Sequence, residues 1–379
     1  MPQTDTKYRI FISAAEPSAD AHCAALIIAL KQRSYDIEFV GVGGPKMAAA
    51  GCKLLETTVG RAAMAYQAFR QVAYFYGLIN RVSSFLQSTK VDLVIVCDSP
   101  AFNFHVAKSA KKAAIKTLFY IAPQLWAWVP WRIGKLRKTC YKLCCALPFE
   151  EEWFRQRGVA TVFVGNPMLD GLHISASNCR SYSDFKPQEA HIALLPGSRK
   201  GEIETLWQPM QQIAILLKSK YPDMRFTTVA ADEEKRQHLA AAELTGFKSS
   251  YAIDAVADVA AKANFAITAS GSVTLELAAA GCPMVVMYQS SRLLWHLLGR
   301  WLVRAKNLSL VNILCGRELV PEFMPYFSSI EPILEEVENL LSDRERLTKI
   351  SRGLVEAVVP LAAKKASEEV ADIVLDMLR

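Results

Sequence analysis

The 379-residue sequence has no uninterrupted apolar run that approaches the ~20 residues needed to cross a bilayer. It also has no apolar signal region ahead of its first hydrophobic segment, which begins near Arg9. These absences favour a cytoplasmic protein without a membrane-spanning helix. Hydrophobic residues make up 51% of the chain and charged residues 21%, which excludes a disordered protein. The length suits two domains, each able to bury its own core.

Paired metal ligands are also missing. The nine cysteines are odd in number and show no metal-type spacing, which favours reduced thiols in a cytoplasmic protein. Cys144 and Cys145 are adjacent and Cys140 lies nearby, but no second pair of cysteines or histidines matches them. The six histidines show no pairing either. We therefore expect buried structural cysteines and no metal site.

What the sequence does have is a regular alternation of apolar strands with helical segments. Strands are predicted at 9–13, 37–42, 91–97, 117–121, 143–147 and 161–164, and then at 191–195, 225–229, 264–268 and 284–287. Such spacing predicts parallel sheets covered by helices on both faces. The predicted fold is α/β, with two facing Rossmann-like domains and a ligand in the cleft at the carboxyl ends of the strands.

The expected first domain covers residues 1–170 and the expected second domain covers residues 188–350. The polar, irregular residues 171–189 between them are typical of a linker. A helical tail is predicted at 351–379, and packing back onto the first domain is one option for it.

A Ser- and Gly-rich turn is the most informative local feature. Ser270, Gly271 and Ser272 follow the strand at 264–268 and open an Ala-rich helix, where free N–H groups and the helix dipole favour a phosphate. Glu276 lies one turn further on, where its carboxylate could accept hydrogen bonds from ribose hydroxyls. The pattern predicts a nucleotide-sugar diphosphate site; an ordinary Ser-capped strand–helix unit is the alternative.

A second turn of this kind follows the strand at 191–195. Gly197 lets the backbone approach a ligand, Ser198 can cap the next helix, and Arg199 offers a guanidinium fork for phosphate oxygens. The alternative is a tight turn with a solvated basic pair. Two such turns in the same half of the chain favour one shared ligand.

The first half of the chain supplies a candidate general base. Asp98 follows the buried strand at 91–97, and α/β folds place their working residues at such strand ends. A partly desolvated carboxylate there could deprotonate a sugar hydroxyl. The alternative is that Asp98 caps the turn before Pro100 or the following helix.

Three further polar residues follow the first strand. Glu16, Ser18 and Asp20 are expected at the mouth of the cleft. For Asp20 we favour a role as the N-cap of the first helix, and for Ser18 a role as a turn residue.

The formal charge of +7 is concentrated in two stretches, 132–142 and 292–306. In the second stretch Trp295 and Trp301 fall at helical spacing among arginines and a lysine, as in an interfacial helix that binds anionic lipid. A buried domain-bridging helix would have a similar pattern. Neither stretch lies in a recognisable nucleic-acid-binding motif, so no nucleic acid is expected as a partner.

Taken together, these motifs resemble those of the lipid-A-disaccharide synthase family. The matching stretches, in order along nearly the whole chain, are 14–20, 39–47, 98–103, 123–128, 147–150, 164–167, 194–199, 269–272 and 312–319. The resemblance implies a GT-B glycosyltransferase peripheral to the inner membrane. Such an enzyme transfers diacylglucosamine from UDP-2,3-diacylglucosamine to 2,3-diacylglucosamine 1-phosphate, inverts the anomeric centre and releases UDP in lipid A biosynthesis. A homodimer is one option for its assembly.

The resemblance also implies roles for residues. Asp98 would be the base for the acceptor 6-hydroxyl, and Glu276 would bind the ribose. The diphosphate would be held by a set comprising Ser198, Arg199, Ser270, Gly271 and Ser272, while Asn312 and Arg317 would line the donor side. No metal or cofactor is implied, because arginines and helix N-termini can neutralise the departing UDP.

The sequence departs from the family pattern in the first half. Ala15, Ala19 and Cys23 stand where the family's first turn usually has glycines, Ala101 where it often has Asp, and Asn166 where it often has His. A changed acceptor or low activity would follow if any of the lost glycines needed a positive φ. Two alternatives stay open. A UDP-sugar epimerase has the same two-domain architecture and similar donor turns. A weakened UDP-sugar-binding homologue is suggested by the lost glycines, and the retained Asp98, Arg199 and Glu276 argue against it.

Overall fold

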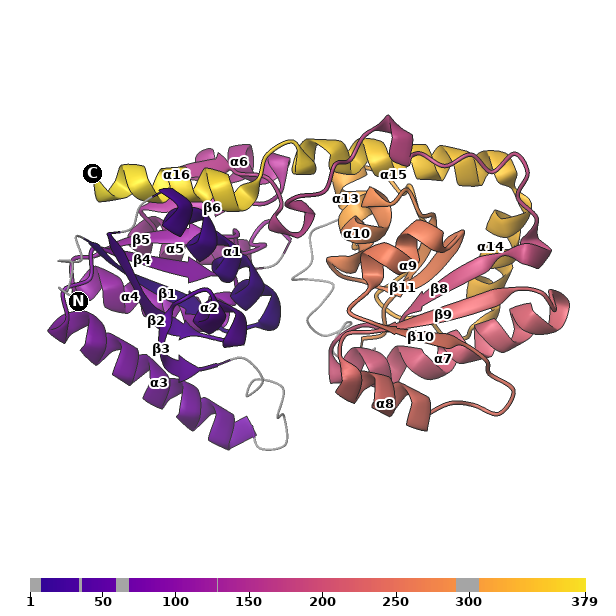
Figure 1. Cartoon of the computed structure of the whole chain (residues 1–379), viewed down its shortest axis with the longest axis horizontal. Coiled ribbons are helices and arrows are strands. Elements are labelled where there is room, and N and C mark those ends of the chain that lie inside the picture. Colours follow the sequence, from indigo (N-terminus) through magenta and orange to yellow (C-terminus); the bar gives the residue numbers. More distant parts are fainter. Residues whose placement is uncertain (1–7, 34–35, 59–67, 128, 291–306) are drawn as a thin grey trace. The chain divides into compact units, whose positions relative to one another are not determined.

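The computed structural model describes residues 8–33, 36–58, 68–127, 129–290 and 307–379. The chain forms two compact units: the first unit comprises residues 1–171 and 361–379, and the second unit residues 172–360 (Figure 1). Each unit is built on one parallel sheet covered by helices, which confirms the predicted α/β class. No helix among the described residues combines the length and the apolar character that crossing a bilayer requires.

The sheet of the first unit has seven parallel strands in the order β3-β2-β1-β4-β5-β6-β7. The strands are β1 (Tyr8–Ala14), β2 (Ile37–Gly43), β3 (Lys53–Thr57), β4 (Leu93–Cys97), β5 (Lys116–Tyr120), β6 (Lys142–Cys145) and β7 (Thr161–Phe163). Every residue of β4 is buried, as expected for a central strand with helices on both faces. Its register with β1 and β5 brings the carboxyl ends of all three strands to one edge.

The helices of the first unit are α1 (Pro17–Arg33), α2 (Pro45–Ala49), α3 (Ala68–Ser88), α4 (Pro100–Lys112), α5 (Ile133–Thr139), α6 (Pro148–Arg155) and α16 (Ala366–Leu378). They cover two cores, one on each face of the sheet. Ile10 and Ile12 point into one core and Phe11 into the other, because successive strand side chains alternate between faces. Helix α3 fills most of the segment between β3 and β4, of which residues 59–67 lie outside the described part of the chain.

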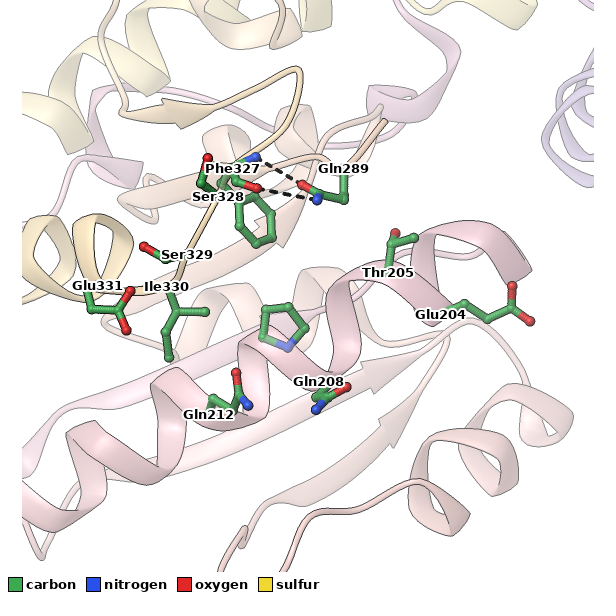
Figure 2. Close-up of a pocket in the computed structure, with 11 residues that line it drawn as sticks. Glu204, Thr205, Gln208, Gln212, Gln289, Phe327, Ser328, Ser329, Ile330 and Glu331 are labelled. Carbon is green, nitrogen blue, oxygen red and sulfur yellow. Dashed lines mark hydrogen bonds between the residues drawn. The ribbon is translucent and has the colours of Figure 1, made fainter. Parts of the chain in front are cut away.

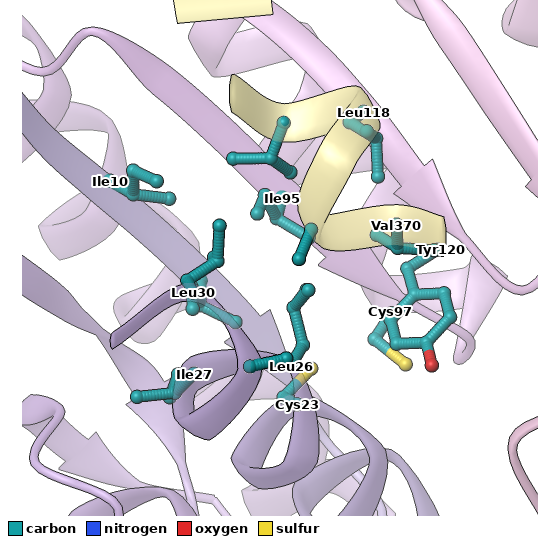
Figure 3. Close-up of a cluster of buried hydrophobic side chains, with 14 of the residues drawn as sticks. Ile10, Cys23, Leu26, Ile27, Leu30, Ile95, Cys97, Leu118, Tyr120 and Val370 are labelled. Carbon is teal, nitrogen blue, oxygen red and sulfur yellow. The ribbon is translucent and has the colours of Figure 1, made fainter. Parts of the chain in front are cut away.

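The C-terminal helix α16 belongs to the first unit. Val370 and Val374 are fully buried in the same core as Leu26 and Leu30 of α1 (Figure 3). Asp170 caps α16: its carboxylate accepts hydrogen bonds from the backbone N–H of Ala366 (2.7 Å) and Ser367 (2.9 Å). Of the tail expected at 351–379, residues 351–360 lie in the second unit, since the continuous helix α15 (Arg344–Ala362) runs through the boundary.

The second unit has a six-stranded parallel sheet in the order β10-β9-β8-β11-β12-β13. Its strands are β8 (His191–Leu195), β9 (Arg225–Ala230), β10 (Ser250–Ile253), β11 (Phe265–Ala269), β12 (Met284–Met287) and β13 (Glu322–Phe323). Its helices, besides α15, are α7 (Lys200–Lys220), α8 (Glu233–Ala241), α9 (Val256–Lys262), α10 (Val273–Ala279), α13 (Leu310–Cys315) and α14 (Glu331–Ser342).

The segment expected to be a linker is packed against the second unit. The Arg180 guanidinium donates to the carbonyls of Ala260, Ala263 and Ala280, at the carboxyl ends of α9 and α10. The hydroxyl of Tyr182 donates to the carbonyl of Asn264 (2.7 Å). A cation there compensates helix-terminal carbonyls that have no partner within their own helix. Arg180 and Tyr182 thus attach this polar segment to the second unit.

The packing of α16 gives a stability prediction. Val370→Ala should lower the free energy of unfolding by about 2 kcal/mol, because two buried methyl groups are lost and a cavity is left behind. Val359→Ala makes the same chemical change at a side chain that is 38% exposed, and should change stability by less than about 0.5 kcal/mol. Urea denaturation followed by circular dichroism measures both. Equal losses of stability in the two variants would contradict the packing assigned to Val370.

Candidate active site

Asp98 lies at the carboxyl edge of the first sheet in a strained turn. Asp98 and Ser99 both have left-handed backbones, with φ of 49° and 42°. Non-glycine residues in this region are unfavourable by about 1–3 kcal/mol each and cluster at functional sites. Ser99, not Asp98, occupies the N-cap position of α4, so the alternative role of Asp98 as the cap of that helix is wrong.

The turn is held in place by Asn103, which is fully buried. Its Nδ2 donates to the carbonyls of Cys97 and Asp98 (both 2.8 Å), and its Oδ1 accepts from the hydroxyl of Ser13 (2.6 Å). The amide thus joins the ends of β1 and β4 and the start of α4. Half-buried Asp98 is therefore presented on a rigid support, as a catalytic base requires.

Glu16 and Ser18 lie close to this turn at the start of α1. The hydroxyl of Ser99 donates to Oε1 of Glu16 (3.1 Å), which brings Glu16 to the Asp98 turn. Ser18 is exposed in the first turn of α1, which begins at Pro17. The structure therefore groups Glu16 with Asp98 and leaves Ser18 accessible at the same strand end.

Asp20 has a different role from the one expected. It lies inside α1 and is buried, and its carboxylate accepts hydrogen bonds from the N–H groups of Gly44 (2.8 Å), Lys46 (3.0 Å) and Met47 (3.0 Å). These N–H groups form the N-terminus of α2, so Asp20 stabilises a neighbouring helix through its free donors and dipole. The prediction that Asp20 caps its own helix is wrong.

The departures in the first turn impose no backbone strain. Ala15, Ala19 and Cys23 are buried, and none of them has a positive φ. Ala19 and Cys23 lie within the regular helix α1. Alanine and cysteine therefore adopt the required backbone conformation without strain at positions where the family usually has glycine.

In the second unit the Pro196–Arg199 turn is organised by Glu202. Its Oε2 accepts from the backbone N–H groups of Ser198 and Arg199 (both 3.2 Å), and its Oε1 accepts from the guanidinium of Arg199 (3.2 Å). Gly197 has a φ of +103°, and a Cβ there would lie 2.4 Å from Oε2 of Glu202. The N-cap position is Arg199 and the carboxylate that caps the turn comes from Glu202, so the expected cap role of Ser198 is wrong.

This arrangement leaves the Arg199 side chain 74% exposed while its backbone N–H is engaged. Any anion bound in this turn would have to compete with the Glu202 carboxylate for these N–H groups. Glu202 lacked a functional prediction, although its position three residues after Arg199 is the N3 position of a capping box.

The Ser270–Ser272 turn joins β11 to α10. The N–H of Ser270 donates to the carbonyl of Met287 (3.0 Å), which ties the turn to β12. Ser272 is the N-cap residue and its side chain makes no capping hydrogen bond, while a Cβ added at Gly271 would meet no atom of the described residues within 4 Å. The turn therefore has open space beside its glycine, where a ligand group can approach.

Glu276 on α10 is half-buried. Burial, reinforced by the negative charge of Asp254, raises its pKa to about 7. Asp254 directly follows β10 with a φ of 48°, and it was not predicted as a site residue because nothing in its local sequence marks it. The structure thus places two carboxyl groups near one another at neighbouring elements of the second unit.

Asn312 and Arg317 differ in accessibility. Asn312 is fully buried: its amide donates to the carbonyl of Val320 (2.8 Å) and to Glu322 (3.0 Å), and it accepts from the N–H of Leu319 and Val320. Its side chain holds the segment that leads into β13, so the expected donor contact is wrong. Arg317 is exposed just after α13.

Glu150 and Trp126 form a second buried polar pair in the first unit. Glu150 accepts from the indole N–H of Trp126 (2.9 Å) and from the N–H of Leu147 (3.1 Å), and burial raises its pKa to about 7. The Trp126 ring packs edge-on against Phe149. Both residues fall in motifs seen in the sequence, but only the structure shows that they contact each other and fix the loop after β5.

A polar pocket of about 420 Å³ lies in the second unit between α7 and the segment after β13 (Figure 2). The side chain of Gln289 pairs with the backbone of Phe327: its Oε1 accepts from the N–H (3.0 Å) and its Nε2 donates to the carbonyl (3.4 Å). The residues that line this pocket include none of the site residues predicted from the sequence.

Solved structures identify the class of the fold. The chain is similar to a Staphylococcus aureus MnaA–UDP structure (TM-score 0.65, 14% identity, 98% of this chain and 97% of that chain). It is also similar to the calicheamicin glycosyltransferase CalG4 (TM-score 0.59, 14% identity, 98% of each chain). The two-sheet arrangement is therefore that of GT-B glycosyltransferases and UDP-sugar epimerases.

Sequence relatives narrow this class. Residues 10–375 match the family model described as lipid-A-disaccharide synthetase. The chain is 35% identical to the lipid-A-disaccharide synthase of Geobacter metallireducens (98% of this chain, 97% of the relative) and 34% identical to that of Geobacter sulfurreducens (99% and 98%). The chain belongs to the lipid-A-disaccharide synthase family and is a glycosyltransferase of lipid A biosynthesis.

The role of Glu202 can be tested by stability. Glu202→Ala should lower the free energy of unfolding by about 1 kcal/mol, because two backbone N–H groups lose their acceptor at the start of α7. Glu204→Ala removes a carboxylate from the same helix that makes only an exposed ion pair with Lys200 (3.6 Å), and should have a smaller effect. Chemical denaturation of both variants is the measurement. An equal loss would show that Glu202 does not organise the turn.

Proposed function

We propose that this protein condenses UDP-2,3-diacylglucosamine with 2,3-diacylglucosamine 1-phosphate, giving a β-1,6-linked disaccharide 1-phosphate and UDP. The observation that carries the proposal is the strained Asp98 turn held by Asn103 at the carboxyl edge of the first sheet. Family membership supports the substrate pair. The epimerase alternative has weaker support, because the similar epimerase structures share only 12–14% identity and indicate the fold alone.

In the proposed reaction Asp98 accepts the proton of the acceptor 6-hydroxyl. The oxygen then attacks the anomeric carbon from the face opposite to UDP, so a new C–O bond forms as the bond to the diphosphate breaks and the configuration inverts. A base in a partly desolvated, rigid position contributes about 10²–10⁴ in rate. Glu16, which lies beside the Asp98 turn, is proposed to contact the acceptor sugar together with Ser18.

The donor is proposed to bind to the second unit. Exposed Arg199 and the Ser270–Ser272 turn would hold the diphosphate, and Glu276 would accept hydrogen bonds from the ribose. Arg317 is exposed and is proposed to reach the donor as well. Similar structures whose titles mention UDP or UDP-GlcNAc support a uridine diphosphate sugar as donor. Negative charge on departing UDP would be neutralised by Arg199 and turn N–H groups, so the step requires no metal.

The acylated substrates support a position on the cytoplasmic side of the inner membrane, with peripheral attachment. The basic-aromatic stretch at 292–306, which suggested an interfacial helix, lies outside the described residues. Attachment through it therefore stays a prediction from the sequence.

The role of Asp98 is tested by Asp98→Asn, which keeps the side-chain shape and a residue that tolerates a left-handed backbone. We expect kcat to fall by about 10²–10⁴, since the amide cannot accept the proton. Product and UDP are measured by mass spectrometry with both diacylglucosamine substrates.

Binding of UDP separates catalysis from donor recognition in this experiment. Asp98→Asn should bind UDP with nearly unchanged affinity, while Arg199→Ala should bind it about 10–100-fold more weakly, because a charged hydrogen bond contributes about 1.5–3 kcal/mol. Full transfer activity in Asp98→Asn would refute its role as base. UDP binding without any product from the wild type would indicate a binding-only homologue.

The pKa of Glu276 predicts how donor binding depends on pH. Ionised Glu276 accepts ribose hydrogen bonds better than the protonated acid, so affinity for UDP-N-acetylglucosamine should rise by about tenfold as pH increases through about 7. In the folded apo-protein the raised pKa acts in the opposite sense: stability should fall as pH rises from 4.5 to about 7, because ionisation is disfavoured by burial. Isothermal titration from pH 5.5 to 8.5 measures binding. Glu276→Gln should remove the pH dependence of binding. A binding profile that is unchanged in this variant would refute the assignment of Glu276 to the ribose.

A further inference from the structure

The loop after β5 lies beside the Asp98 turn, and its one exposed side chain has no role in the site described above. We define the β5 loop as residues 121–127. The N–H of Asp98 donates to the carbonyl of Tyr120 (3.2 Å), and Ile121 follows directly. The carboxyl ends of β4 and β5 are paired in register at Cys97 and Tyr120, so the β5 loop starts at the same sheet edge as Asp98.

The β5 loop is held firmly by its neighbours. Ile121 begins it with a φ of 69°, and Val129 follows it with a φ of 46°. β-Branched residues adopt this left-handed region only where the surrounding structure imposes it. Leu125 is buried in the core on one face of the sheet, and the indole N–H of Trp126 donates to buried Glu150 (2.9 Å). The loop is therefore fixed at its ends and in its middle.

Gln124 is the one residue of the β5 loop that is exposed. Its amide has no hydrogen-bond partner among the residues that the structure describes, whereas the only other polar side chain of the loop, Trp126, is bound to Glu150. A primary amide both donates and accepts, as a hydroxyl group does. The loop contains no Lys or Arg, so it suits a neutral polar group better than a phosphate.

The strand order β1-β4-β5 places Asp98 between two sets of polar side chains. Glu16 and Ser18 follow β1 on one side, and Gln124 follows β5 on the other. An extended chain spans at most about 3.6 Å per residue, so the Cα of Gln124 lies within about 14 Å of that of Tyr120. A sugar whose hydroxyl reaches Asp98 is then flanked by Gln124 on its β5 side.

We propose that Gln124 selects the acceptor by a hydrogen bond to the 4-hydroxyl of its sugar ring. The inference rests on the proposed function, whose acceptor carries acyl groups at positions 2 and 3, phosphate at position 1 and the reacting hydroxyl at position 6. The 4-hydroxyl is therefore the remaining free hydroxyl, and carbon 4 is bonded to the ring carbon that bears the 6-hydroxyl arm. The Oε1 atom of Gln124 would accept from this hydroxyl, and its Nε2 atom would donate to the hydroxyl oxygen.

The test compares 2,3-diacylglucosamine 1-phosphate with its 4-deoxy analogue as acceptors in transfer assays of the full chain. The wild type should use the 4-deoxy acceptor with a kcat/KM about 3–10-fold lower, the effect of one neutral hydrogen bond. Gln124→Ala should lose a similar factor with the natural acceptor and then use both acceptors equally within about twofold. The KM for the UDP-sugar donor should not change.

Gln188→Ala is the matched control. Gln188 is also an exposed glutamine, but it lies before β8 in the second unit, away from the Asp98 edge. This variant should keep the wild-type preference for the natural acceptor. Because both glutamines are exposed, neither substitution should prevent folding, and thermal unfolding of the two variants checks this expectation.

Equal use of the two acceptors by the wild type would overturn the proposal. A loss of activity in Gln124→Ala that leaves the preference between acceptors intact would also overturn it. If the wild type forms no disaccharide, the proposed function fails, and calorimetric titration with the two acceptors decides the role of Gln124. Tighter binding of the natural acceptor that disappears in Gln124→Ala would then support the 4-hydroxyl contact, and equal binding of both acceptors would overturn it.

Discussion

The buried amide of Asn103 is the interaction on which the proposed chemistry depends. It satisfies the carbonyls of Cys97 and Asp98 and receives the hydroxyl of Ser13, so its three hydrogen bonds join two central strands to α4. Two adjacent left-handed residues would not persist in a turn without such support. Because every polar atom in this group has a partner, the network holds the turn rigidly instead of leaving buried groups unsatisfied. The position of the Asp98 backbone is thus set by the hydrogen bonds of Asn103, which lies in the first turn of α4.

Carboxylates that accept backbone N–H groups recur through both units. Asp20 serves the start of α2, Asp170 the start of α16, Glu150 the start of α6 and Glu202 the start of α7. At α2, α6 and α16 the helix start that the carboxylate caps has no proposed role in ligand binding. Glu202 differs because its turn is also the proposed diphosphate site, so its negative charge disfavours phosphate on the same N–H groups. Donor affinity would then depend chiefly on the exposed Arg199 guanidinium, which Glu202 orients.

The sequence was sufficient to predict the α/β class, the main strands and the two polar turns, because periodicity and turn residues are local signals. It was not sufficient for Asp20, whose partners at Gly44 and Met47 are distant in sequence, or for Asn312, whose polarity suggested a ligand but whose amide is fully used by residues 319–322. The short strands β3 and β10 and helix α2 were missed, since five residues or fewer carry little periodicity. Arg180 attaches the 171–189 segment to the second unit through hydrogen bonds to residues about 80–100 positions further along the chain, and composition cannot reveal such contacts.

The cysteine at position 23 shows how a departure from the family pattern can be read physically. Cys23 is fully buried in the core that also contains Cys97 (Figure 3). Burial and the neighbouring Cys23 raise the pKa of the Cys97 thiol well above its usual range, so the Cys97 side chain acts as a neutral, space-filling group. A glycine in the regular helix α1 would leave that space to its neighbours. Cys97 immediately precedes Asp98, so the side chain of Cys23 adds packing beneath the strained turn. The backbone at position 23 has no positive φ and therefore does not require glycine. The change from glycine to cysteine also removes no group from the sheet edge that carries Asp98.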